Sequence, residues 1–257
     1  EVDPRFLAML KAWEDRRFDT HEGVDPLALL RAGWQSLWAG RVVSGGSTLT
    51  MQVARLLEDG STGEWQGKLR QMRVALALEK RLSKSEILTL YLALAPYGGN
   101  IEGLRAASLV WFGKEPRRLT PAEAALLVAL PQSPETRRPD RARHRAEAAR
   151  DRVLERMVEA GLLSTSEAEA AMSEPLPALR ADFPQLAPHL SDRARAAQPE
   201  ALRIDLTLDA TLQKALERLA EKALRGRNDA LSIAILVADH RSGEILTSVG
   251  SSGFEAE

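Results

Sequence analysis

Apolar residues recur with a helical period through the first 156 residues. Segments such as "DPLALLRAGWQSLWAG", "LTMQVARLLE", "KLRQMRVALALEKRL", "SKSEILTLYLALA" and "TPAEAALLVALPQ" place apolar positions at i, i+3, i+4 and i+7. This spacing is typical of amphipathic helices. Residues that cap helix N-termini stand at several predicted starts, among them Asp25, Ser83 and Thr120. The pattern predicts an all-helical domain.

The pattern changes further along the chain. Residues 137–200 are rich in Arg, Ala and Pro, with a predicted helix ended by Gly161, a short helix opened by Ser164, and then the proline-punctuated "EPLPALRADFPQLAPHL". Beyond it, "LRIDLTLD" and "LSIAILVADHRSGEILTSVGS" predict strands, the latter a hairpin, and "ATLQKALERLAEKAL" predicts a helix between them. We expect a mainly α chain: a helical domain over 1–160, a linker over 161–202, and an incomplete α/β segment over 203–257.

Composition narrows the class of protein. The 257 residues, 44% of them hydrophobic, can bury one large core or two smaller ones, and a formal charge of −1 argues against a dedicated nucleic-acid binder. The chain has no cysteine, its four histidines lack zinc-site spacing, and it contains no P-loop and no run of 18 apolar residues. We expect a soluble fragment of a longer protein, because the sequence starts and stops without closing elements.

Two polar stretches have chemical interpretations. "EDRRFDTH" (14–21) gathers acids, arginines, a phenylalanine and a histidine, which suits either a solvated helix end or a catalytic site. "SGGSTLT" (44–50) opens a predicted helix, so its free N–H groups and hydroxyls suit an anion, although a capped surface loop has the same composition. A second glycine-rich loop, "APYGGNIEG" (95–103), indicates a tight turn. Each stretch alone leaves its alternatives open.

The order of the motifs points to a family. "EDRRFDTHEGVD", "GGSTLTMQVAR", "KLRQMRVALALEKRLSKSEILTLYL", "GLRAASLVWFGK" and "LTPAEAALLVALPQSP" follow one another within about 120 residues. This series resembles the glycosyltransferase domain of class A penicillin-binding proteins, the family 51 peptidoglycan glycosyltransferases. The resemblance covers most of residues 1–160 and implies a lysozyme-like helical fold. The segment from about residue 203 is similar to the start of the family's transpeptidase domain.

The resemblance also implies roles for individual residues. Glu14 falls on the family's catalytic general base, which takes a proton from the acceptor sugar. The other matching positions are implied to line the cleft or grip the donor's pyrophosphate: Asp15, Phe18, His21, Ser47, Thr48, Gln52, Arg55, Lys68, Gln71, Lys84 and Tyr91.

Some positions depart from the family pattern. Gln71 stands where the family has a second acid, and Met51 and Ala93 replace a glutamine and an asparagine. A glutamine amide cannot carry the negative charge that holds a metal tightly. A divalent cation, Mg²⁺ or Mn²⁺, is therefore in doubt as a cofactor, and no metal ligand is assigned.

The resemblance implies partners and a location. The substrates are lipid II and the growing glycan chain, and residues 26–43, rich in Trp, Leu and Arg, are implied to touch the membrane surface, although a core-facing helix would show the same pattern. The implied location is the periplasmic face of the bacterial inner membrane, with an anchor outside this chain. Other cell-wall synthesis proteins are further candidates, and no nucleic acid is expected.

Three functions remain open. The first is polymerisation of lipid II, with inversion at the anomeric carbon and release of undecaprenyl pyrophosphate. The second is glycan cleavage by a lysozyme-like enzyme, and the third is a catalytically weak cell-wall scaffold. Transpeptidation is not expected from this fragment, because no serine is followed three residues later by lysine and no K-T-G occurs.

Overall fold

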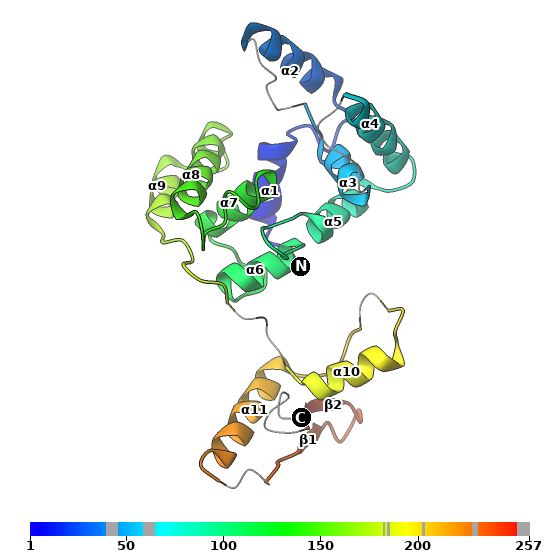
Figure 1. Ribbon diagram of the computed structural model, residues 1–257, viewed down its shortest axis with the longest axis vertical. Helices are drawn as coiled ribbons and strands as arrows, with labels where there is room; N and C mark the ends of the chain where they lie inside the picture. The colour runs from blue at the N-terminus through cyan, green and yellow to red at the C-terminus, as the bar shows by residue number, and fades with distance from the viewer. Residues whose placement is uncertain are drawn as a thin grey trace. The chain divides into compact units, whose positions relative to one another are not determined.

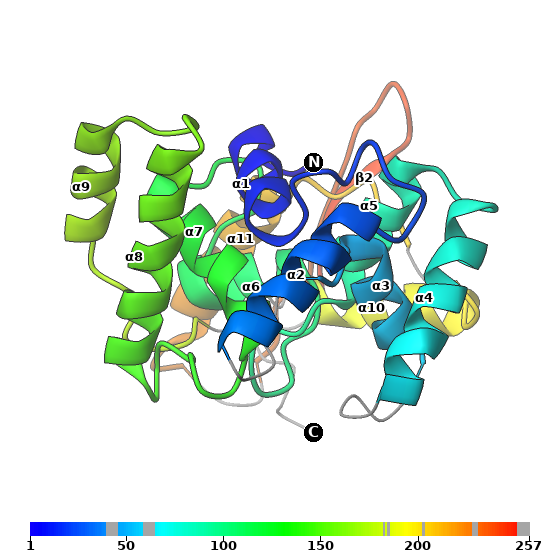
Figure 2. The ribbon, with the colours of Figure 1, turned by 90° about the horizontal axis from the view of Figure 1, so that it is seen from above.

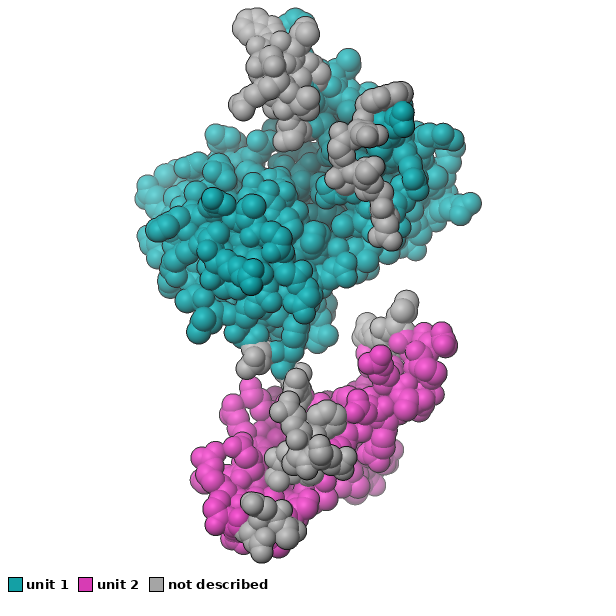
Figure 3. Space-filling model, viewed as in Figure 1, with its two compact units in different colours: residues 1–183 teal, residues 184–257 magenta. Residues whose placement is uncertain are grey.

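The computed structural model divides the chain into two compact units, residues 1–183 and 184–257 (Figure 3). The structure describes residues 1–39, 46–58, 65–181, 183, 186–201, 204–227 and 231–250. Within these ranges it contains eleven α-helices, one short 3₁₀ helix and a single two-stranded sheet. The predicted mainly α class is confirmed.

In the described part of unit 1 the regular elements are helices, apart from one isolated β-bridge between Pro96 and Glu102 (Figure 1). Its elements are α1 (Pro4–Glu14), α2 (Pro26–Ala39), α3 (Leu49–Leu57), α4 (Trp65–Glu79), α5 (Lys84–Leu94), α6 (Leu104–Phe112), α7 (Pro121–Ala129), η1 (Leu130–Gln132), α8 (Arg143–Glu159) and α9 (Thr165–Ser173). Figures 1 and 2 both show α1 between the α8–α9 pair and the α3–α4 pair. Figure 3 shows a hollow in the surface of unit 1 between these two sides.

Helix α7 forms the centre of the core. Seven of its nine residues are buried, and it packs against α1, α6, α8 and α9. The sequence "PAEAALLVA" allows this because alanines let the neighbouring helices approach while its leucines and valine fill the space between them. On the other side of the unit, α3 packs against α4 and α5. Glu14, at the last turn of α1, is thus carried by a helix that packs on the core.

Side-chain caps fix several helix starts as predicted. Ser83 and Thr120 each form a capping box with the glutamate three residues on. Asp25 accepts hydrogen bonds from the backbone N–H groups of Leu27 (3.0 Å) and Ala28 (3.2 Å) at the start of α2. Such caps satisfy N–H groups that have no partner inside the helix.

Unit 1 continues beyond residue 160, where the sequence predicts a linker. The predicted helix end at Gly161 is present, with φ +71°, and Ser164 caps α9. Helix α9 then packs against α7 and α8, since Ala168 and Ala171 are buried in the same core. The helix α10 (Pro188–Ala197), which no sequence pattern predicted, lies in the remainder of the predicted linker.

Unit 2 contains α10, α11 (Ala210–Leu224) and the antiparallel pair β1 (Ile235–Ala238) and β2 (Ile245–Val249). The buried Gln213 of α11 joins helix to sheet: its amide donates to the Ser248 carbonyl (3.0 Å) and accepts from the Ser248 N–H (2.8 Å). The predicted hairpin and helix are both present.

The strand predicted over "LRIDLTLD" is wrong for its described part. Residues 204–209 run beside β2, where Asp209 N–H donates to the Leu246 carbonyl (2.9 Å) and the Thr207 hydroxyl donates to the Ile245 carbonyl (2.7 Å). One backbone bond is not a ladder, which requires repeated N–H to C=O pairs along both strands. Among the described residues, no helix is both long and apolar enough to cross a membrane.

Candidate active site

Glu14 is held at the end of α1 by two side-chain amides. Gln52 of α3 donates to Glu14 Oε2 (2.8 Å), and Gln132 of η1 donates to Glu14 Oε1 (2.9 Å). Each carboxylate oxygen thus has a donor from a different element, and the side chain is still partly exposed. The two bonds orient the carboxylate and leave lone pairs for a further partner.

Burial raises the pKa of Glu14 above its usual range. The amides of Gln52 and Gln132 and the positive charges of Arg137 and Arg55 oppose this effect and moderate it. A raised carboxyl pKa makes the group a better proton acceptor once it is ionised. The environment of Glu14 therefore suits a general base.

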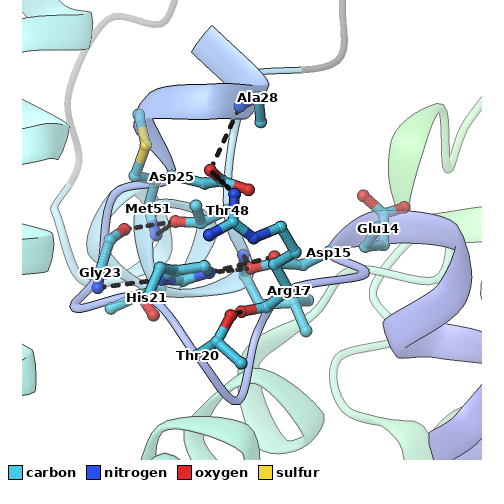
Figure 4. A network of polar contacts seen from close by, with 12 residues as sticks. Glu14, Asp15, Arg17, Thr20, His21, Gly23, Asp25, Ala28, Thr48 and Met51 are labelled. Carbon is cyan, nitrogen blue, oxygen red and sulfur yellow. Dashed lines mark hydrogen bonds and ion pairs between the residues drawn. The ribbon is translucent and has the colours of Figure 1, made fainter.

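The neighbouring carboxylate, Asp15, has a different environment. It is buried and accepts hydrogen bonds from His21 Nε2 (2.9 Å) and from the backbone N–H of Leu49 (2.9 Å). His21 Nδ1 accepts from the Gly23 N–H (3.1 Å), so the proton of the imidazole lies on Nε2. In Figure 4 the Glu14 carboxylate points away from this pair. Asp15 and His21 thus anchor the loop after α1.

The loop after α1 is fixed to the start of α3. Thr48 caps α3 by accepting from the Met51 N–H (3.1 Å), and its hydroxyl donates to the Gly23 carbonyl (2.5 Å) (Figure 4). Gly23 has φ +91°, and a Cβ there would lie 2.7 Å from the Ala75 carbonyl oxygen. Glycine is needed at this position, because the backbone of α4 approaches too closely for a side chain.

Positive charge gathers at the last turn of α3, which carries Arg55, and near the start of α4, which carries Lys68. The Lys68 ammonium donates to the Ser47 hydroxyl. Burial and the nearby Arg55 lower the pKa of Lys68. Arg55 lies three residues after Gln52 on α3, and its positive charge acts to lower the pKa of Glu14. Two cations close enough to affect each other, one of them bonded to the Ser47 hydroxyl just before α3, form a site suited to an anion.

Lys84, predicted to grip pyrophosphate, is engaged inside the protein. Its ammonium donates to Glu79 Oε1 (2.6 Å) and to the His21 carbonyl (2.6 Å), and it lies 4.7 Å from the centre of the buried Phe18 ring. Thr50 donates to the same Glu79 oxygen (2.7 Å). These contacts tie the loop after α1 to α3, α4 and α5, so Lys84 acts here as a structural tie.

The remaining predicted residues differ in exposure. Tyr91 is fully buried, and its hydroxyl has no hydrogen-bond partner among the described residues. Burial, together with the charge of Glu14, raises its pKa well above the usual value. Gln71 lies half-exposed on α4, and its side chain bonds to no other described residue. Tyr91 thus forms part of the wall behind Glu14, while Gln71 is accessible.

Sequence patterns alone did not identify three residues that act on Glu14 or are affected by it: Gln132, Arg137 and Tyr97. Arg137 Nη1 donates to Gln132 Oε1 (3.3 Å), so it supports the amide that holds Glu14. Tyr97 is buried, and its pKa is raised by burial and by Glu14. The only sequence signal was the place of Gln132 in "LPQSP", since nothing local indicates that it meets a residue 118 positions earlier.

Comparison with known proteins identifies the same family as the sequence motifs. Residues 1–158 match the family described as Transglycosylase, and the chain therefore belongs to the transglycosylase family. It is 47% identical to penicillin-binding protein 1C of Escherichia coli over 98% of this chain and 32% of that protein. The forms "LTMQVARLL" and "APYGGN" favour the same 1C subgroup. The resemblance to class A penicillin-binding proteins is confirmed.

Other relatives are more distant. The chain is 33% identical to penicillin-binding protein 1A of Aquifex aeolicus over 83% of this chain and 31% of that protein. A crystal structure of penicillin-binding protein 1A from Haemophilus influenzae matches 77% of this chain and 34% of that one at 20% identity, with a TM-score of 0.36. A score this low does not by itself establish a shared fold. The chain spans about a third of the length of these curated relatives.

Proposed function

We propose that this chain is a peptidoglycan glycosyltransferase that polymerises lipid II into glycan strands. The observation that carries the proposal is Glu14, a carboxylate with a raised pKa held by Gln52 and Gln132 beside cationic groups. Membership of the transglycosylase family supports the same activity. Glycan cleavage also needs a carboxylate, but it gives no role to the cations Lys68 and Arg55.

Glu14 is the general base of the proposed reaction. It takes the proton from the hydroxyl of the acceptor sugar, and the oxygen forms a bond to the anomeric carbon of the donor. The bond from that carbon to undecaprenyl pyrophosphate breaks, and the pyrophosphate leaves with the electron pair. A single displacement on the face opposite the leaving group inverts the anomeric configuration.

The leaving pyrophosphate is assigned to the cations at α3 and α4. Lys68 and Arg55 would neutralise its developing charge, and the Ser47 hydroxyl would donate a hydrogen bond. Lys68 has a lowered pKa because burial and Arg55 disfavour its charge, and an incoming anion would remove that cost. The hydroxyl and cations are therefore arranged for an anionic ligand.

A divalent cation does not fit the residues around Glu14. The charged neighbours that act on Glu14 are Arg137 and Arg55, whose positive charges would repel a metal ion. No group of three or more histidine, aspartate or glutamate residues suited to a metal occurs in the described ranges. Mg²⁺ and Mn²⁺ prefer several oxygen ligands with negative charge. We assign no step to a metal.

Helix α2 is the proposed contact with the membrane. Leu27, Leu30 and Trp34 are 60%, 71% and 66% exposed, and Arg31 lies among them. Figure 1 shows α2 projecting from the rest of unit 1. Exposed Leu and Trp with Arg are typical of a helix lying in the membrane interface. The predicted residues 40–43 lie outside the described part. A membrane contact agrees with action at the periplasmic face of the inner membrane, on a lipid-linked substrate.

One experiment separates the candidate functions. The chain is incubated with lipid II in detergent, and separately with finished uncrosslinked glycan, and the products are resolved on a gel. Growth of polymer from lipid II supports the proposal. Shortening of finished glycan would indicate a cleaving enzyme, and no change in either sample would indicate a scaffold; both results would contradict it.

A further inference from the structure

Helix α8 carries arginines of two kinds. Arg143 pairs with Glu147 (2.9 Å) and the buried Arg150 pairs with Asp151 (2.8 Å). Arg145, Arg152 and Arg156 are exposed and form no ion pair with any residue in the described ranges. We call these three residues the arginine strip.

The arginine strip follows one side of the helix. Residues 145 and 152 are seven apart, and 152 and 156 are four apart, so the three share a face. By the helical rise, the strip extends about 16 Å. None of the large hydrophobic side chains that are exposed in the described part lies on α8. The strip is thus a hydrophilic row of three guanidinium groups, and the exposed carboxylates of Glu155 and Glu159 lie beside it, three residues after Arg152 and Arg156.

One end of the strip reaches α1 beside Glu14. The Arg156 guanidinium lies 5.6 Å from the centre of the Trp13 ring, and Trp13 immediately precedes Glu14 in α1. Helices α1 and α8 pack against each other in the core of unit 1. The Arg156 end of the strip therefore lies against α1 at the residue next to Glu14, and the strip continues from there along α8.

The strip is also linked to Glu14 through Arg137. Arg152 is close enough for its charge to act on Arg137, whose side chain contacts the Gln132 amide that binds Glu14. Two guanidinium groups near each other repel, and the Glu14 carboxylate offsets part of that repulsion at Arg137. An anion bound along the strip would remove part of this repulsion.

We propose that the arginine strip binds the peptide carboxylates of a glycan strand that passes the active site. This rests on the proposed function, because that reaction makes a polymer whose repeating units carry short peptides, and each peptide ends in a carboxylate. Guanidinium groups bind carboxylates through paired hydrogen bonds. A row of separated arginines suits a polymer with repeated charges better than a single small anion. Anionic lipid is less suited, because none of the large apolar side chains exposed in the described part lies on α8.

The test measures binding of finished strands, which requires no turnover. Fluorescent uncrosslinked glycan strands with intact peptides are titrated with the chain and with the variant R145Q/R152Q. The control R143Q/R225Q removes two charges from exposed arginines that are paired with Glu147 and Glu221. We expect R145Q/R152Q to weaken binding about five- to tenfold, from two exposed charge contacts, and the control to bind like the original chain. R145K/R152K should restore part of the affinity.

Two further samples identify the ligand. Strands stripped of peptides by an amidase should bind weakly and equally to the original chain and R145Q/R152Q. Phosphatidylglycerol vesicles should bind both chains equally. Equal binding of intact strands by both chains would overturn the proposal, as would a loss confined to vesicles, which would assign the strip to lipid. Failure of the chain to polymerise lipid II would contradict the proposed function. The binding result could still be interpreted, because it requires no turnover.

Discussion

Gln132 Nε2 donates to Glu14 Oε1 at 2.9 Å and so joins two residues 118 positions apart in the sequence. The bond connects the last turn of α1 with the short helix η1 that continues α7. With Gln52 on the other oxygen, it fixes a carboxylate that would otherwise rotate freely at a helix end. The orientation of the candidate base therefore depends on how α1, α3 and α7 pack.

Replacing Glu14 by glutamine tests the base directly. Glu14→Gln keeps the shape of the side chain and removes the proton acceptor, so turnover of lipid II should fall about 10²-fold or more. The rate of polymer formation in detergent is the measurement, with Glu22→Gln, outside the predicted site, as the control. Near-normal turnover in Glu14→Gln would show that another group takes the proton.

The raised pKa of Glu14 predicts a pH-dependent stability. The folded protein holds the proton of Glu14 more tightly than the unfolded chain, so its contribution to stability is fully present below the unfolded pKa and is lost as pH rises through the folded pKa. Glu14→Gln should therefore be more stable than the original chain at neutral pH, with the difference vanishing in acid. Thermal unfolding between pH 4 and pH 8 measures this. A stability difference between the two proteins that stays constant from pH 4 to pH 8 would show that the raised pKa of Glu14 is not its cause.

Gln132 should tune the pH profile of the reaction. Its hydrogen bond lowers the pKa of Glu14, so Gln132→Leu should raise that pKa further. Because the base must be ionised, the acidic limb of kcat/KM should move to higher pH. Gln198→Leu, in unit 2, is the control and should leave the pH profile unchanged. Gln132→Glu would not serve, because it places a second negative charge beside the Glu14 carboxylate. An unmoved acidic limb in Gln132→Leu would remove Gln132 from this role.

Gln71 predicts a weak dependence on divalent cations. A neutral amide at this half-exposed position cannot hold a metal tightly, so a chelator should change the activity of the original chain little. Gln71→Glu should increase the dependence on Mg²⁺ or Mn²⁺, measured as activity against cation concentration. Loss of all activity in chelator with the unaltered chain would mean that other ligands hold an essential metal.

Lys84 should matter for stability. Lys84→Met leaves the Glu79 carboxylate, whose side chain is only 9% exposed, without its ammonium partner. We expect a loss of about 1–3 kcal/mol in the free energy of unfolding. Denaturant unfolding measures it, with the exposed Lys80→Met as control. If Lys84 instead only gripped substrate, the variant would unfold like the original chain and show a raised KM alone.

Local patterns were sufficient for most of the helices. Period and caps predicted the starts of α2, α5, α7 and α9, because a cap uses side chains within three residues of the N–H groups it satisfies. The same logic failed for residues 204–209, where an alternating pattern suggested a strand. Pairing with β2 there is a single backbone bond, and no local pattern reports whether a partner strand is in register.

The sequence by itself determined the helical class and the family motifs, because these depend on residue type and spacing, and the resemblance that those motifs carry implied Glu14 as the candidate base. Only the tertiary structure decided which neighbours act on it. It brought Gln132 and Arg137 to Glu14, placed Tyr91 in the buried wall, and engaged Lys84 with Glu79. The reason is physical: the pKa and orientation of a side chain depend on burial and on groups within a few ångströms, and packing sets those distances independently of sequence separation.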